Sequence, residues 1–107
     1  NSIQANAETV LTDDVVDETL FSFDATNFRA GSFEYSITRD TAVRYGTFTV
    51  VPTGGGTLTY TDDYSENSST GVTFSASQVG DIVTVSYTTT NTGIDGSLTY
   101  TNYSFRV

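Results

Sequence analysis

The fold of this chain is decided by the stretch SFEYSIT at residues 32–38. Within it, Phe33, Tyr35 and Ile37 alternate with small or polar residues. Successive side chains of a β-strand point to opposite faces, so this alternation marks a strand with one buried face and one solvated face. The stretch therefore predicts a strand that covers a hydrophobic core on one side only.

The same alternation recurs at short intervals along the 107 residues. Further strands are marked by Phe21 and Phe23, Val43 and Tyr45, Phe48 and Val50, Leu58 and Tyr60, Val72 and Phe74, Val83 to Tyr87, and Leu98 and Tyr100. Turn-forming residues separate these segments, which lack a helical period. The sequence predicts an all-β fold: a single small antiparallel β-sandwich of about seven to eight strands, with an extended N-terminal arm.

Two local features modify this regular pattern. The apolar positions change phase between Tyr45 and Phe48, so we expect the strand to bend or bulge at Gly46. From Asp62 to Gly71 the residues are mostly Asp, Ser, Glu, Asn and Thr, which favour turns over strand pairing. The longest exposed loop is therefore expected there.

The composition excludes most enzyme chemistry. The chain has no His, Cys, Met or Trp. It thus lacks a proton shuttle near neutral pH, a thiolate nucleophile, and nitrogen or sulfur ligands for zinc, copper or iron. Its 13 acidic residues offer carboxylate pairs, but a small sandwich rarely encloses a cleft for catalysis. The two acidic runs, Asp13 to Glu18 and Asp62 to Glu66, lack the alternating carboxylates and glycine of a calcium loop, and a solvated acidic loop is the plainer interpretation. We expect no catalytic residue, cofactor or metal, and no enzyme activity.

Charge and hydropathy bear on two further classes of partner. Nucleic-acid binding requires clustered Lys and Arg, whereas this chain has a formal net charge of -9 and four scattered basic residues, Arg29, Arg39, Arg44 and Arg106. No apolar run approaches the roughly 20 residues that cross a bilayer. We therefore expect neither nucleic-acid binding nor membrane insertion.

The chain divides into a predicted N-terminal arm, residues 1–17, and a predicted β-sandwich domain, residues 18–107. A small sandwich buries a limited share of its surface, and association with further copies is a common way to bury more. The arm is polar overall but carries four candidate subunit contacts: Val10, Leu11, Val15 and Val16. We expect these residues to pack on another copy of the chain.

A candidate ligand contact lies in the predicted loop. Tyrosine combines an apolar ring face, which suits stacking on a sugar ring, with a polar tip. Tyr64 stands in the loop among side chains that form hydrogen bonds. Core packing is the default interpretation for an aromatic residue in a strand, and Tyr64 is the exception because it lies in the loop. The expected glycan contacts are Tyr64, Asp62, Asp63, Glu66 and Asn67.

The stretch from Thr19 to Val107 also resembles a known class of domain. The resemblance is carried by ATNFRAGSFEYSITR (25–39), GTFTVVP (46–52), GVTFSASQVGDIVTVSYT (71–88) and the closing YTNYSFRV. In these phrases the chain is similar to small β-sandwich modules of tailed-bacteriophage virion structural proteins, of the tail fibre, spike and decoration types. The resemblance implies no particular binding residues.

That resemblance implies a non-enzymatic structural or host-attachment module on the virion exterior, an extracellular location. Its implied partners are copies of itself, with a trimer favoured, other virion proteins, and a host-surface glycan. A monomeric carbohydrate-binding module or bacterial surface adhesin domain is the alternative. The arm discriminates between the two, because an arm packed on another subunit favours assembly and a free arm favours sugar binding.

Overall fold

A computed structural model describes the backbone of residues 2–26, 28–54 and 57–106 and the side chains of residues 8–26, 30–52 and 58–101. Within these ranges the chain forms β-strands and no helix. The strands are β1 (Ser2–Leu11), β2 (Glu18–Asp24), β3 (Phe28–Arg39), β4 (Ala42–Gly54), β5 (Thr57–Glu66), β6 (Val72–Val79), β7 (Ile82–Thr89) and β8 (Gly96–Arg106). The predicted domain ranges also include Asn1 and Val107, which lie outside the described residues.

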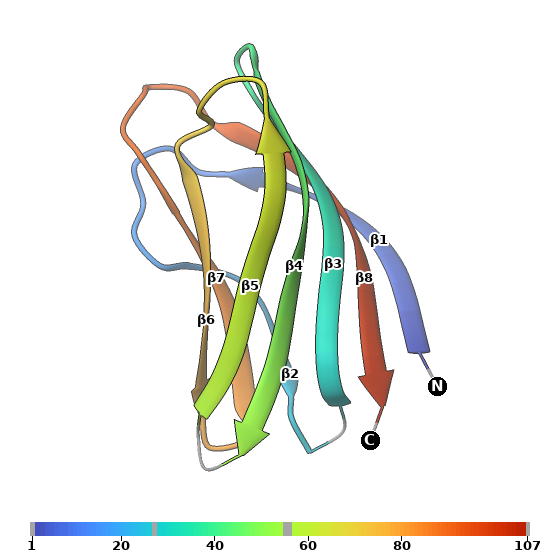
Figure 1. The fold of residues 1–107 in the computed structure, drawn as a ribbon. Coiled ribbons are helices and arrows are strands. Elements are labelled where there is room, and N and C mark those ends of the chain that lie inside the picture. Colours follow the sequence, from blue (N-terminus) through green and yellow to red (C-terminus); the bar gives the residue numbers. More distant parts are fainter. Residues whose placement is uncertain (1, 27, 55–56, 107) are drawn as a thin grey trace.

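The strands form two antiparallel sheets, one in the order β1-β8-β3-β4-β5 and the other in the order β2-β7-β6 (Figure 1). The chain crosses from one sheet to the other after β1, β2, β5 and β7. This architecture confirms the predicted all-β antiparallel sandwich. Throughout the described ranges, no helix provides an apolar segment of membrane-spanning length.

The core lies between the sheets and is centred on Phe33 of β3. The centroid of its ring is 5.3 Å from that of Phe48 in the same sheet. It is 5.6 Å from that of Phe74 and 5.5 Å from that of Phe21, both in the opposite sheet. Buried and less buried residues alternate along β3, as the sequence predicts. The other buried apolar residues of this core are Leu11, Tyr35, Ile37, Val50, Val72, Val83, Val85, Tyr87 and Leu98.

The N-terminal segment is extended, as predicted, but most of it belongs to the sandwich. Ser2–Leu11 forms β1, which pairs with β8 in one continuous register from Ser2 opposite Phe105 to Leu11 opposite Gly96. The side chain of Leu11 is 0% exposed and lies in the core. Leu11 can reach the core because alternate residues of an edge strand still face the opposing sheet.

β4 runs through Gly46 without the predicted bulge. It pairs with β3 in one register on both sides of this glycine. Val43 and Tyr45 face outward and are exposed, and the buried inward position between them is taken by Arg44. The apolar residues change phase in the sequence because a charged residue, Arg44, occupies an inner-face position. The strand contains no extra residue at this point.

β5 extends into the segment predicted to be a loop. Asp62–Glu66 pairs with β4, with Asp62 opposite Phe48 and Glu66 opposite Arg44. β5 is an edge strand with a neighbour on one side only, so polar side chains there keep access to water. The expected long exposed loop is thereby reduced to residues 67–71.

Candidate functional site

The candidate site is the inner face of β5, at the edge of the five-stranded sheet. Alternate residues of a strand share a face, which places Tyr60, Asp62, Tyr64 and Glu66 in one row. Tyr64 lies opposite Gly46 of β4. The opposing sheet has only three strands and covers this row incompletely. Tyr60 and Tyr64 consequently each remain 45% exposed.

Arg44 of β4 is buried next to this row and contacts three of its residues. Its side chain is 4% exposed, and Nε donates a hydrogen bond of 3.0 Å to Oε2 of Glu66. Its Nη1 lies 3.7 Å from Oδ2 of Asp62 and has no hydrogen-bond partner among the described residues. The ring of Tyr64 covers the guanidinium, with 3.9 Å between Cζ and the ring centroid. A buried cation is thus held by two carboxylates and one aromatic ring.

Asp62 is fixed by a second buried group. The hydroxyl of Tyr35 donates a 2.6 Å hydrogen bond to Oδ1 of Asp62. Burial, together with the nearby charges of Asp63 and Glu66, raises the pKa of Asp62 above its ordinary value although Tyr35 and Arg44 act to lower it. Burial, followed by the bond to Asp62, also raises the pKa of Tyr35 far above its ordinary range. The phenol therefore stays protonated and acts as a donor to the carboxylate.

Glu66 joins the β5 row to the loop that follows it. Its Oε2 accepts a 3.1 Å hydrogen bond from the hydroxyl of Thr70 in addition to the bond from Arg44. Burial alone would raise the pKa of Glu66, but the hydrogen bonds from Arg44 and Thr70 bring it below its ordinary value. Glu66 is therefore ionised at neutral pH and holds residues 67–70 against the end of β5.

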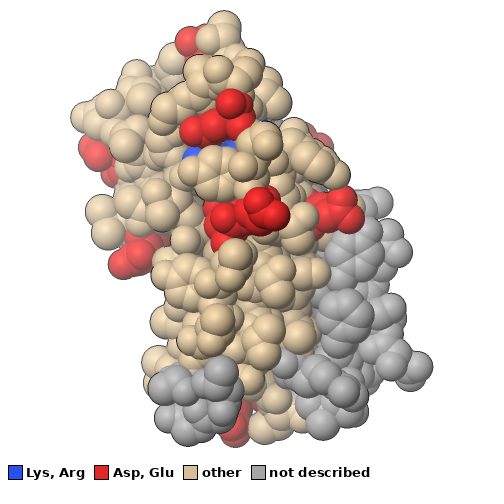
Figure 2. Space-filling model, viewed as in Figure 1, with Lys and Arg blue, Asp and Glu red and all other residues tan. Residues whose placement is uncertain are grey.

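The surface above this network is acidic and partly aromatic. On the face where β4 and β5 lie in front, basic atoms show only as a small patch among acidic groups (Figure 2). Asp62 and Glu66 keep side-chain exposures of 17% and 20%. A carboxylate offers about four lone-pair sites, so each can accept further hydrogen bonds from a ligand. The site can therefore stack against rings and accept hydrogen bonds from hydroxyl groups.

The structure brings together three of the five predicted glycan contacts. Tyr64, Asp62 and Glu66 share the inner face of β5, whereas Asp63 points to the outer face of the sheet and is exposed. Asn67 has a structural role, because its Oδ1 accepts a 2.8 Å hydrogen bond from the backbone N–H of Val43. Asp63 and Asn67 therefore do not belong to the row.

Sequence reasoning missed the two residues that organise the site, Arg44 and Tyr35. Both lie in strands that the alternation of apolar residues predicts. Arg44 stands between Val43 and Tyr45, and a rule that places only apolar residues on the inner face assigns it to the solvent face. The signal that identifies Arg44 as buried is the pairing of β4 with the acidic end of β5. That pairing cannot be seen in β4 alone.

The four predicted subunit contacts do not form one exposed set. Val10 and Val16 are 62% and 78% exposed, while Val15 is partly buried against the core. Leu11 is fully buried within its own sandwich, which overturns its assignment as a subunit contact. Only Val10 and Val16 remain strongly exposed among the four.

A second buried arginine, Arg39, fastens the end of the sandwich where β3 ends. Its Nε donates to the carbonyl of Ile94 at 2.8 Å, and its Nη1 donates to the carbonyl of Thr70 at 2.9 Å. Its Nη2 donates to the carbonyl of Thr90 at 2.7 Å and to the carboxylate of Asp13. One guanidinium thus ties together three connecting segments that are distant in the sequence.

We call Arg39, Asp13 and the carbonyls of Thr70, Thr90 and Ile94 the Arg39 lock. Asp13 contributes to it from the N-terminal segment. It accepts hydrogen bonds from the backbone N–H groups of Thr92 at 2.9 Å and Gly93 at 3.1 Å. The bond from the Thr92 backbone, with the bonds from Gly93 and Arg39, lowers the pKa of Asp13 below its ordinary value despite partial desolvation. Within the described ranges no group of three or more acidic residues is placed to hold a metal ion.

The chain was also compared with known proteins. No family model, curated protein or solved structure matched it.

Proposed function

We propose that the protein is a non-enzymatic carbohydrate-binding module that holds a neutral oligosaccharide along the inner face of β5. The observation that carries this proposal is the pair Tyr60 and Tyr64, each 45% exposed, on either side of the Asp62 carboxylate. Residues four apart in a strand are separated by about 13 Å, so the two rings reach different units of one extended ligand.

The fixed carboxylates support the same proposal. Tyr35 and Arg44 hold Asp62, and Arg44 and Thr70 hold Glu66, so a ligand meets acceptors whose positions are already set. A site that is ordered before binding loses less conformational entropy when the ligand arrives. Sugar hydroxyls donate to carboxylates, and the C–H faces of sugar rings pack on aromatic rings.

The charge of the site supports a neutral ligand. Arg44 is covered by Tyr64 and bonded to Glu66, so it does not present a free cation to an anionic sugar. The formal net charge of -9 adds a repulsive field for uronic acids and sulfated glycans. We therefore expect neutral oligosaccharides to bind and their acidic counterparts to bind more weakly.

The proposal is tested by calorimetric titration of the full chain with neutral gluco-, manno-, galacto- and xylo-oligosaccharides. Tyr60→Ala is expected to weaken binding about tenfold, which corresponds to roughly 1.4 kcal/mol. Tyr64→Phe is expected to bind as the wild type does, because the ring face is retained. Tyr45→Ala is the matched control, since Tyr45 is also an exposed strand tyrosine but points to the opposite face of the sheet.

Two outcomes would contradict this function. One is an absence of binding to every oligosaccharide by the wild-type chain. The other is binding that Tyr60→Ala and Tyr45→Ala weaken equally, since the contact would then not be specific to the inner face of β5.

A second candidate is an exterior structural or host-attachment module of a bacteriophage virion, assembled as a homo-oligomer. The observation that favours self-association is the exposure of Val10 and Val16, at 62% and 78%. Exposed valines at an N-terminal edge strand and the segment after it offer apolar surface to another copy. The resemblance to tail fibre, spike and decoration modules supports a trimer, contacts with other virion proteins and a place on the virion exterior.

This second candidate is tested by light scattering of the wild-type chain and of the double variant Val10→Ser with Val16→Ser. A wild-type trimer that dissociates in the variant would support it. A wild-type monomer over the accessible concentration range would contradict self-assembly of this chain. Replacement of exposed valines leaves the core intact, so a change in mass reports association and not unfolding.

A further inference from the structure

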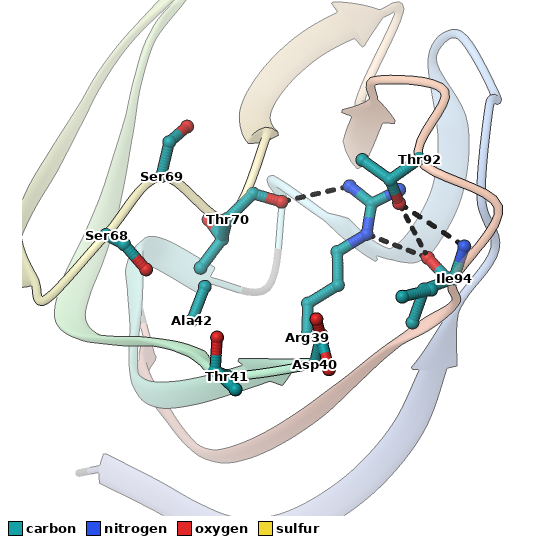
Figure 3. A pocket seen from close by; sticks show the side chains of 9 residues that line it. All are labelled: Arg39, Asp40, Thr41, Ala42, Ser68, Ser69, Thr70, Thr92 and Ile94. Carbon is teal, nitrogen blue, oxygen red and sulfur yellow. Dashed lines mark hydrogen bonds between the residues drawn. The ribbon is translucent and has the colours of Figure 1, made fainter.

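A cavity of about 190 Å³ opens at the end of the sandwich, beside the Arg39 lock (Figure 3). Three segments surround it: the turn that joins β3 to β4, the loop of residues 67–71 between β5 and β6, and the connection from β7 to β8. Asp40, Thr41, Ser68 and Ser69 contribute polar groups to its lining, and Ala42 and Ile94 contribute apolar surface.

The cavity offers hydrogen-bonding groups that the fold does not use. The hydroxyls of Thr41 and Ser69 have no hydrogen-bond partner among the described residues. The hydroxyl of Ser68 makes only a long bond of 3.4 Å to the neighbouring Asn67. In Figure 3 the side chains of Thr41 and Ser68 point toward the space between the β3–β4 turn and the loop. A ligand in this space can therefore pair with hydroxyls that are otherwise left to water.

The walls of the cavity are held in place from behind. Arg39 ties the carbonyls of Thr70 and Ile94 together through hydrogen bonds of 2.9 Å and 2.8 Å. The side-chain amide of Asn67 donates a 3.3 Å hydrogen bond to the carbonyl of Thr41. This bond links the loop to the turn at Thr41, which lines the cavity, so the site exists before any ligand enters.

We propose that this cavity binds a single pyranose ring, as a second subsite for the carbohydrate ligand. The inference rests on the proposed function, because the β5 row supplies the contacts for the rest of the oligosaccharide. A cavity of about 150 Å³ suffices for one benzene ring, so a cavity of 190 Å³ takes one six-membered ring whose substituents extend through the open side. Glu66 and Thr70 connect this cavity to the β5 row.

The lining selects a neutral, hydroxyl-rich ring. Asp40 can accept two hydrogen bonds from adjacent hydroxyls, and the exposed side of Ile94 can pack on the C–H face of the ring. The side chain of Arg39 is buried, donates to three carbonyls and is paired with the carboxylate of Asp13, so it does not offer an exposed, unpaired cation to a carboxylate or phosphate.

The test is a ¹⁵N–¹H NMR titration of the full chain with the methyl glycosides of glucose, mannose and galactose, and separately with the corresponding oligosaccharides. We expect a methyl glycoside to shift the amide signals of Thr41, Ser69 and Thr92 without shifting that of Tyr60. The variant Thr41→Val is expected to weaken this binding at least threefold. Thr49→Val is the matched control, because Thr49 is exposed on the outer face of β4.

The two kinds of ligand separate a free sugar from a chain end. Equal affinity for the glycoside and the oligosaccharide supports capture of a free sugar in the cavity. Tighter binding of the oligosaccharide, reduced by Tyr60→Ala to the level of the glycoside, supports binding of its terminal unit there. Either result supports a pyranose subsite.

The failures are also distinguishable. If oligosaccharides shift Tyr60 and Tyr64 but no sugar shifts the cavity signals, the inference is overturned and the proposed function stands. If neither region shifts with any probe, both are overturned. Glycoside binding of unchanged affinity in Thr41→Val would also overturn the inference, because the ring would not depend on the lining hydroxyl.

Discussion

Tyr64 lies across Arg44, with the guanidinium carbon 3.9 Å from the centre of the ring. The contact is possible because the residue beside Tyr64 on β4 is Gly46, which has no side chain to separate the two strands' inner faces. The tyrosine therefore serves the fold and the proposed ligand contact together. One side of its ring shields a buried cation, while the residue as a whole remains 45% exposed.

Removal of this ring is expected to destabilise the protein. Tyr64→Ala should lower the free energy of unfolding by about 1–2 kcal/mol, because Arg44 loses the aromatic face that covers it. Tyr64→Phe keeps that face and should stay close to wild type. Urea denaturation of the three proteins measures the difference, and equal losses in both variants would show that the hydroxyl, not the ring, is what matters.

Gly46 is expected to tolerate no side chain. A Cβ built there would lie 2.5 Å from the Cβ of Tyr64 and 2.6 Å from the carbonyl oxygen of Asp63. Gly46→Ala must therefore push β4 and β5 apart, at a cost of about 1–3 kcal/mol in urea denaturation. Gly96→Ala is the control, because the nearest atom there is 3.4 Å away, at Leu11. A Gly46→Ala protein as stable as the wild type would contradict the close pairing of these strands.

Stability is expected to fall at alkaline pH because of Tyr35. Burial, and then the bond to Asp62, raise its pKa in the folded state above the ordinary value of 10.0. A group with a raised folded pKa stabilises the fold below the unfolded pKa, and this contribution is lost as pH rises above about 10. Burial raises the pKa of Tyr100 in the same direction.

The alkaline effect can be measured by urea denaturation between about pH 8 and pH 11. Tyr35→Phe should lower stability at neutral pH by about 1–2 kcal/mol through loss of the bond to Asp62. It should also reduce the alkaline slope, leaving the smaller part from Tyr100. An unchanged slope in Tyr35→Phe would show that Tyr35 ionises in the folded state as readily as in the unfolded chain.

Stability is expected to fall at acidic pH because of Asp13. Hydrogen bonds, first that from the Thr92 backbone, lower its folded pKa below 3.8. A depressed folded pKa stabilises the fold above the unfolded pKa, and this contribution is lost as pH falls through the folded pKa. The melting temperature of Asp13→Asn should therefore be lower than that of the wild type at neutral pH. The difference should shrink as the pH falls below about 4. A gap in melting temperature that is constant with pH would contradict this assignment.

Leu11 is expected to be essential to the sandwich although it lies near the start of the chain. Leu11→Ala should cost about 2–5 kcal/mol, as for a fully buried leucine. Val10→Ser, one residue earlier and on the exposed face, should change stability by less than about 0.5 kcal/mol. Thermal unfolding of the two variants measures the contrast. Equal behaviour would show that β1 does not pack as described.

The fold could be predicted because its core follows one simple rule. Phe33, Tyr35 and Ile37 alternate with polar residues, and the same period marks Val83, Val85 and Tyr87. Such a pattern specifies which residues face inward whatever the neighbouring strands are. The all-β class and the antiparallel sandwich follow from this pattern and from the turn residues between strands.

The site could be predicted only in part, because it depends on charges that pair across strands. Asp62 and Glu66 are typical of a loop until Arg44 is known to lie beside them. Arg44 in turn is typical of a solvent-facing position until those carboxylates are known. Each residue contradicts its local pattern, and the contradiction is resolved only when β4 and β5 pair. Local pattern reasoning cannot supply that information.

The pairing of the first strand with the last has a consequence for how the module can be mounted. β1 and β8 run antiparallel, so Ser2 lies opposite Phe105, and the start of β1 and the end of β8 lie at one pole of a body 40 Å long (Figure 1). The β3–β4 turn and the connection from β7 to β8, which border the cavity, lie at the other pole. A polypeptide attached at either end would thus hold the domain at the pole opposite the cavity, and the cavity would face away from the point of attachment.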